Sequence, residues 1–231
     1  MSASDWQQRR QEWTDEEAAE RYDMQRFSSA KGRRKHSNDI KCLLAALGAH
    51  LPKAPSDEPH TILDLPCGTG RLHADLQAAG YKVHGADLSK EMLEVASKSV
   101  GSAPLLRSEA ERLPLVDSCA DVIISLRFLI HIRDAVARQR ILSEMSRVAR
   151  HLVIAQVRDS RSLKHRLRRL RHSLHLPAKL REPTLDQAAL ANELKSAGLE
   201  LLAVSPISRL FSDKALFIAR PLRRAGDLRD D

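Results

Sequence analysis

The sequence predicts an α/β domain with a doubly wound, mostly parallel seven-stranded sheet that ends in an antiparallel hairpin. Short apolar runs alternate with amphipathic helical segments from about residue 60 to 157, and this alternation is typical of βαβ units. The run at 121–126 is nearly continuous in β-branched residues, as in a parallel strand covered on both faces. The last two apolar runs, 199–204 and 215–219, leave no room for a helix between them, so they are expected to pair antiparallel.

The other elements can be placed in order along the chain. Residues 39–48 carry apolar side chains at helical spacing. Ser89 is a good helix N-cap, and Gly80 is suited to end the helix before it. Further strands are expected at 61–65, 81–86, 104–107 and 151–157, and further helices at 72–79, 90–99, 134–150, 161–176 and 185–197.

The length of 231 residues fits one sizeable α/β domain, which we place at 51–222. A helical arm is expected at 1–50, where charges alternate with aromatic side chains, and Tyr22 in this arm is expected to close over a bound cofactor as a lid. A basic helical insertion is expected at 159–182 and a polar tail at 223–231.

The composition excludes several classes of protein. Three cysteines without pair spacing argue against a disulfide framework or a zinc site. No apolar run approaches the roughly 18 residues of a membrane span, and no secretory signal is recognisable, so the cytoplasm is the expected compartment. The net charge of +8 favours acidic partners, while only 3% aromatic residues count against a protein that reads unstacked bases.

The first motif is the segment 63–71, Leu-Asp-Leu-Pro-Cys-Gly-Thr-Gly-Arg, where a strand ends, the chain turns on glycines and a helix starts. Gly68 and Gly70 allow the backbone to approach a ligand closely, and ligands of open α/β sheets bind at this edge. His73 stands where the dinucleotide fingerprint needs its third glycine, so binding of NAD or FAD is disfavoured.

Two acidic residues follow later strands. Asp87 ends the second strand, where a carboxylate can accept both hydroxyls of a ribose. Glu109 follows the third strand, where a carboxylate can accept the amino hydrogens of adenine and the N–H of Ala110 can reach a ring nitrogen. Glu111 lies close by and is an alternative to Glu109.

Together these motifs resemble the class I S-adenosylmethionine (SAM)-dependent methyltransferase superfamily, in its branch with small-molecule acceptors. The likeness covers roughly residues 60–157 and implies a Rossmann-like fold and SAM as cofactor. It implies that Asp64 and the glycine turn hold the methionine end of SAM, that Asp87 holds the ribose, and that Leu88 packs on adenine. The residues expected to bind the cofactor are Tyr22, Asp64, Pro66, Cys67, Gly68, Gly70, Asp87, Leu88, Glu109, Ala110 and Leu126.

The loop after the fourth strand carries the candidate catalytic residues, His131 and Arg127. His131 is suited to act as a general base near neutral pH, and Arg127 to bind an anionic acceptor. Two departures from the family weaken the analogy. Pro66 replaces the usual first glycine of the turn, which removes one N–H, and Ile130 stands in place of the first of two usual histidines.

Each of these residues also has an ordinary structural interpretation. The glycines can form a plain turn, Asp64 can cap a helix, and Asp87 can face the N-terminal dipole of the next helix. Cys67 can be a small buried packing residue. His131 can be a packed histidine and Arg127 a surface charge.

The basic segment 161–181 is the most individual feature, because it holds eight Lys and Arg residues and no acidic one. Its helical part carries leucines on one face, so it is a candidate for an anionic membrane surface or another polyanion. The alternative is that these leucines pack on the domain. The leucines are Leu163, Leu167, Leu170 and Leu174.

The functional hypothesis is therefore a methyltransferase acting on a small or lipid-linked acceptor that carries negative charge, with a possible peripheral membrane contact. Two alternatives stay open. An RNA methyltransferase would use the basic helix on phosphates, although the sequence lacks an Asn/Asp-Pro-Pro-Tyr motif and a catalytic cysteine after the fourth strand. A non-catalytic SAM-binding regulator would bind the cofactor without turnover. No metal site is expected.

Overall fold

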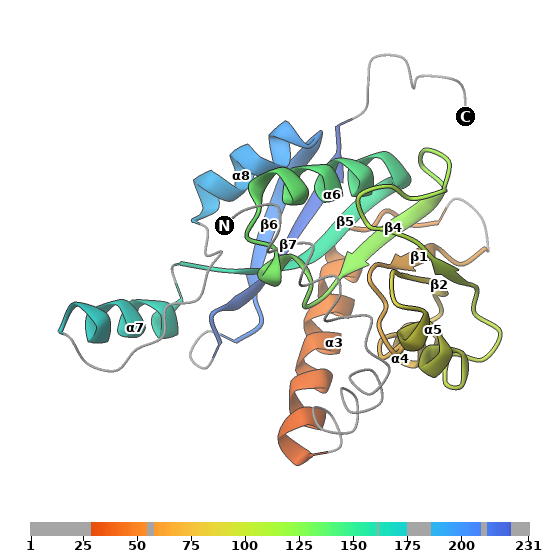
Figure 1. Ribbon diagram of the computed structural model, residues 1–231, viewed down its shortest axis with the longest axis horizontal. Helices are drawn as coiled ribbons and strands as arrows, with labels where there is room; N and C mark the ends of the chain where they lie inside the picture. The colour runs from red at the N-terminus through yellow and green to blue at the C-terminus, as the bar shows by residue number, and fades with distance from the viewer. Residues whose placement is uncertain (1–28, 55–57, 161, 175–185, 209–211, 223–231) are drawn as a thin grey trace.

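The computed structural model describes residues 29–54, 58–160, 162–174, 186–208 and 212–222, and it confirms the predicted fold class (Figure 1). One seven-stranded sheet has the strand order β3-β2-β1-β4-β5-β7-β6. Six strands run in one direction and β7 runs against them, paired antiparallel with both β5 and β6. The strands are β1 (Thr61–Asp64), β2 (Lys82–Asp87), β3 (Leu105–Arg107), β4 (Ala120–Ser125), β5 (Ala149–Arg158), β6 (Leu199–Pro206) and β7 (Lys214–Pro221).

The helices begin where the sequence offers side-chain caps. Ser89 accepts a hydrogen bond from Met92 N at 3.1 Å, and Asp134 accepts one from Val136 N at 2.8 Å. The helices are α3 (Ala30–His50), α4 (His73–Ala78), α5 (Lys90–Ser97), the short 3-10 helix η1 (Leu129–His131), α6 (Ala135–Val148), α7 (Leu163–Ser173) and α8 (Gln187–Ser196).

Helices cover both faces of the sheet, which explains why the central strands are apolar on both sides. All six residues of β4 are buried. Ile123 packs in the cluster shared with α6 and α8, whereas Val122 and Ile124 pack in the cluster shared with α3 and α4. Figure 1 shows these two pairs of helices on opposite sides of the strands.

Helix α3 is longer than the helix expected at 39–48. Ser29 caps it by accepting a hydrogen bond from Gly32 N, and the polar stretch that follows carries no apolar periodicity to reveal it. Leu43 and Leu47 on its second half are fully buried against the sheet. The rest of the expected arm, with Tyr22, lies outside the described residues.

Helix α7 packs little on the domain, and Figure 1 shows it projecting from the sheet. Its four leucines are 44–60% exposed, so the interpretation that they pack on the domain is wrong. Among the described residues, no helix combines the length and the apolar character that crossing a bilayer demands.

Candidate functional site

The predicted site residues that the structure describes gather at one edge of the sheet. They follow the carboxyl ends of β1, β2, β3 and β4, which are neighbours in the sheet. This is the edge at which open α/β sheets bind ligands.

The two glycines of the turn after β1 have different roles. Gly68 has φ of +54°, and a Cβ placed on it would meet nothing within 4 Å. Gly70 has φ of +75°, and a Cβ there would lie 2.3 Å from Cγ1 of Val100, just after α5. Gly70 therefore permits close packing of the turn on α5, whereas Gly68 keeps open the space in front of the turn.

Pro66 and Cys67 form the start of this turn. The Cys67 N–H donates to the carbonyl oxygen of Ala86 on β2 at 2.9 Å. Burial raises the pKa of the buried Cys67 thiol, so it stays protonated. Cys67 is therefore a packing residue whose backbone ties the turn to β2. Pro66 is partly buried and offers only its carbonyl group to a ligand.

Asp64 ends β1 with an almost fully buried carboxyl group. Its Oδ2 lies 3.7 Å from Nε2 of the fully buried His73 and has no hydrogen-bond partner among the described residues. Burial raises the pKa of Asp64 to about 8, against the opposing charge of Arg71. Burial, helped by nearby His84, lowers the pKa of His73 to about 4. At neutral pH the two groups are therefore uncharged, and Asp64 keeps an unused oxygen.

Asp87 ends β2 and fastens the glycine turn to it. Its Oδ2 accepts a hydrogen bond from Gly68 N at 2.8 Å, and its Oδ1 accepts one from Ser89 N at 3.0 Å. Burial raises the pKa of Asp87, while these backbone N–H groups act in the opposite direction. Each carboxylate oxygen can accept more than one hydrogen bond, so both retain capacity for ligand hydroxyls.

The ends of β2 and β3 bring the residues predicted to contact adenine to the same edge. Leu88 and Ala110 are partly buried, and the Glu109 carboxylate is exposed. Glu111, the alternative to Glu109, forms an ion pair with Arg140 of α6 at 3.8 Å. Glu109 and Glu111 both stay candidates for contact with a ligand at this edge.

Arg127 follows β4 with a positive φ of +63° and reaches α3. Its guanidinium contacts Oδ2 of Asp39 at 2.7 Å, and that of Arg71 lies 3.6 Å from the same oxygen. Leu126 packs its side chain in the cluster with α3. His131 is partly buried in η1, four residues beyond Arg127. Arg127 is thus a partly buried ion-pair partner and not a plain surface charge.

Sequence reasoning missed two further cations at this edge, Lys214 and Arg158. They are paired in the register of β5 and β7, which brings the start of β7 beside the end of β5. Burial and the charge of Arg127 lower the pKa of Lys214 to about 8, although Asp39 acts against them. The sequence shows a lysine directly before an apolar strand. Which residues surround that lysine, however, depends on where β7 is inserted in the sheet.

Gln156, two residues before Arg158 on β5, is a third residue that sequence reasoning missed. It is fully buried, and both atoms of its amide lack a hydrogen-bond partner among the described residues. Buried amides are normally satisfied, so an unsatisfied one needs an explanation.

Comparison with known proteins agrees with this geometry. A family model described as a methyltransferase domain matches residues 63–153. A malonyl-(acyl-carrier protein) O-methyltransferase of Pectobacterium atrosepticum is 33% identical over 46% of the chain and 43% of its own length. A ubiquinone/menaquinone biosynthesis C-methyltransferase of Campylobacter jejuni is 33% identical over 38% of the chain and 39% of its own length. The chain therefore covers less than half the length of these relatives.

Solved structures share the fold. The magnesium protoporphyrin IX methyltransferase of Synechocystis, solved with bound SAH, is 21% identical, with a TM-score of 0.62 over 81% of this chain and 84% of its own. The order of the motifs, the strand order and the family match lead to one conclusion. Residues 63–153 form a methyltransferase domain, and the chain has the fold of class I SAM-dependent methyltransferases.

Proposed function

We propose that this protein transfers the methyl group of SAM to a small or lipid-linked acceptor that carries negative charge. The proposal rests on the contact between the turn after β1 and the end of β2. There the Gly68 N–H is held by Asp87, and Asp64 keeps an unused buried oxygen.

The residues at this edge suit the parts of SAM. Asp64 would receive the ammonium of the methionine end, whose positive charge favours the ionised carboxylate. Asp87 would accept the ribose hydroxyls, and Leu88, Glu109 and Ala110 would contact adenine. The open space before Gly68 leaves the backbone accessible to the ligand.

Bound SAM supplies an activated methyl group, so the protein mainly has to align the acceptor with it. Alignment alone is worth about 7–11 kcal/mol in well-oriented reactions. A base is needed only where the acceptor must lose a proton, and His131 is the candidate on the loop after β4.

The first test is calorimetric titration with SAM and with SAH, with NADH as control. Binding of both SAM forms and none of NADH is expected. The substitution Asp87→Asn should weaken binding about 10- to 100-fold, because it removes charge-assisted hydrogen bonds. Asp117→Asn, at an exposed aspartate, is the matched control. Binding of NADH, or of neither SAM form, would refute the cofactor assignment.

The negative charge of the acceptor is inferred from the cations at the same edge. Arg127 and Arg158 lie near Lys214, with the buried carboxylates of Asp39 and Asp213 among them. The unsatisfied amide of Gln156, on β5 with Arg158, offers a further donor. Basic side chains that are partly desolvated bind carboxylates and phosphates well.

Relatives named for malonyl-(acyl-carrier protein) and for quinones support a small or carrier-linked acceptor. The test is to screen acidic and neutral metabolite and lipid fractions for SAM-dependent formation of SAH. Turnover confined to anionic fractions is expected, with a raised KM in Lys214→Met. Turnover on neutral fractions alone would contradict the proposed charge. Binding of SAM without turnover on any fraction would favour the regulator.

Helix α7 supports a contact with an anionic lipid surface. Its leucine face is exposed, and the helix contains no acidic residue. Arg168 is anchored to Asp213, so the helix is attached at the edge where β7 begins. A surface-bound α7 would hold that edge near a lipid-linked acceptor.

A further inference from the structure

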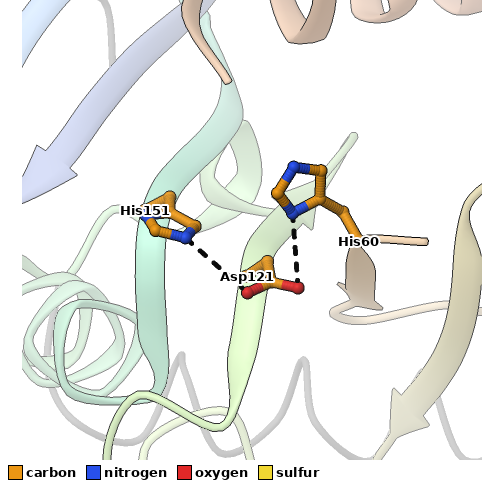
Figure 2. Close-up of side chains that lie close together, drawn as sticks. All are labelled: His60, Asp121 and His151. Atoms are coloured by element: carbon orange, nitrogen blue, oxygen red, sulfur yellow. Dashed lines mark ion pairs between the residues drawn. The ribbon is translucent and has the colours of Figure 1, made fainter. Parts of the chain in front are cut away.

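A second polar cluster lies at the opposite edge of the sheet, where three neighbouring strands start. His60 directly precedes β1, Asp121 is the second residue of β4, and His151 is the third residue of β5. Figure 2 shows both imidazole rings turned toward the Asp121 carboxylate on the strand between them. The ligand-type atoms of the three residues all lie within 4.8 Å of one another.

The hydrogen bond of His60 to Pro52 determines which ring nitrogen faces the Asp121 carboxylate. Its Nε2 lies 2.9 Å from the carbonyl oxygen of Pro52, which can only accept a hydrogen bond, so Nε2 carries a hydrogen. In the neutral ring Nδ1 is then an unprotonated acceptor, and it faces Oδ2 of Asp121 at 3.5 Å. In that tautomer two acceptors face each other, and either a proton on Nδ1 or a metal ion between the two atoms would satisfy both.

We propose that His60, Asp121 and His151 bind a divalent transition-metal ion of the Zn²⁺ type, with water completing the coordination. Zinc binds imidazole nitrogen and carboxylate oxygen at about 2.0–2.2 Å, which places tetrahedral ligands about 3.4 Å apart. Nδ1 of His60 lies 3.5 Å from Oδ2 of Asp121, and Nε2 of His151 lies 3.8 Å from its Oδ1. Both distances are close to that spacing, so the carboxylate would present one oxygen toward each imidazole. Two histidines with one carboxylate suit such a metal better than Mg²⁺ or Ca²⁺.

The surroundings orient the three ligands as metal sites require. The hydrogen bond from His60 to Pro52 fixes the tautomer that presents Nδ1, and the Thr61 N–H donates to Oδ2 of Asp121 at 2.8 Å. The two rings meet edge to face, with centroids 6.0 Å apart. The His151 side chain is 26% exposed, which gives water access to an open position.

Arg150 is the residue that competes with a metal for Asp121. Its guanidinium contacts Oδ1 at 2.8 Å, yet its side chain is 53% exposed and can turn into solvent. Removing this positive charge should therefore raise the metal affinity.

The place of the cluster indicates a structural role. It joins the starts of three adjacent parallel strands, and the glycine turn lies at the other end of β1. A bound ion would fasten β1, β4 and β5 without touching the proposed SAM site.

The test is a titration of the chelator-treated, untagged full-length protein with Co²⁺ alone, followed by displacement with Zn²⁺. One equivalent should give the visible absorption of a four- or five-coordinate site, without the thiolate charge-transfer band that cysteine ligands produce. At free Zn²⁺ about 100 times Kd, the melting temperature should rise by about 5–10 °C.

Variants show whether the ion sits in this cluster. His60→Ala and His151→Ala should weaken binding by about 100-fold or more, and Arg150→Gln should strengthen it. His172→Ala, at an exposed histidine of α7, should bind like wild type. Circular dichroism verifies that each variant folds. Absence of one-equivalent binding, a thiolate band, or unchanged affinity in both folded histidine variants would overturn the proposal.

Discussion

Single residues of the turn after β1 can be distinguished by substitution. Gly70→Ala should lower the free energy of unfolding by about 2–5 kcal/mol, because the new Cβ clashes with Val100 and the positive φ is strained. Gly68→Ala should cost only about 1–2 kcal/mol, because only the backbone is strained. The measurement is urea denaturation followed by circular dichroism.

Gly48→Ala is the matched control, because this glycine lies inside α3 with open space around it. That substitution should leave stability unchanged or raise it by up to about 1 kcal/mol. In Gly68→Ala the loss of SAH-binding free energy should exceed the loss of unfolding free energy, because the Cβ of the new alanine points into the proposed ligand space. Equal stability of the Gly68 and Gly70 variants would contradict this division of roles.

Asp64 makes stability depend on pH in a definite direction. Its pKa is raised from 3.8 to about 8 in the folded state, so the folded protein retains a proton that the unfolded chain releases. Stability from this group is complete below pH 4 and is lost as pH rises toward 8. Asp64→Asn should therefore gain stability relative to wild type by up to about 1.4 kcal/mol per pH unit across that window.

The comparison requires denaturation curves of both proteins at several pH values between 4 and 9. The difference should become constant above pH 8, once Asp64 is ionised in both states. A difference that does not change with pH would show that the folded carboxyl titrates normally. Glu94→Gln, at an exposed glutamate on α5 that pairs with Lys90, provides the control.

At the scale of elements, α7 gives a prediction about lipid. The protein should sediment with vesicles that contain anionic lipid and not with purely zwitterionic vesicles, and salt should weaken the binding. Leu167→Ser and Leu170→Ser should each weaken binding roughly tenfold, because each removes an exposed apolar side chain that the bilayer would bury.

Leu222→Ser, at an exposed leucine outside α7, is the matched control and should bind as well as wild type. Equal binding to both kinds of vesicle would exclude the anionic surface. Unchanged binding of the Leu167 and Leu170 variants would show that the leucine face takes no part.

Most elements could be predicted from the sequence because local chemistry determines them. The apolar run at 121–126 predicted β4, and the N-cap at Ser89 predicted the start of α5. The position of β7 between β5 and β6 could not be read, since it depends on pairing between distant segments. The first half of α3 was missed because its residues are polar on all sides.

The residues of the site divide in the same way, into those that local motifs predict and those that depend on pairing between distant segments. Asp64, Gly68 and Asp87 lie in contiguous motifs, and the structure brings them together at one edge of the sheet. Lys214 reaches that edge only through the reversed strand, so no spacing along the chain predicts it. The metal candidates are spread over three strands, far from the short spacings that identify metal motifs.

At the scale of the whole molecule, the two proposed ligands would bind at opposite ends of the same strands. From Asp121 to Arg127 the chain advances six residues, about 20 Å at about 3.3 Å per residue. Sites this far apart without shared partners contribute independently to stability. SAH and Zn²⁺, each at about 100 times its Kd, should each add about 2.7 kcal/mol to the free energy of unfolding.

Together the two ligands should add about 5.4 kcal/mol, because they stabilise one cooperative domain through separate contacts. The measurement is urea denaturation with neither ligand, with each alone and with both. In His60→Ala only the contribution of Zn²⁺ should vanish, and in Asp87→Asn only that of SAH should fall. A combined effect clearly smaller than the sum would mean that the ligands share a site or compete through the sheet, and would contradict the separation of the two edges.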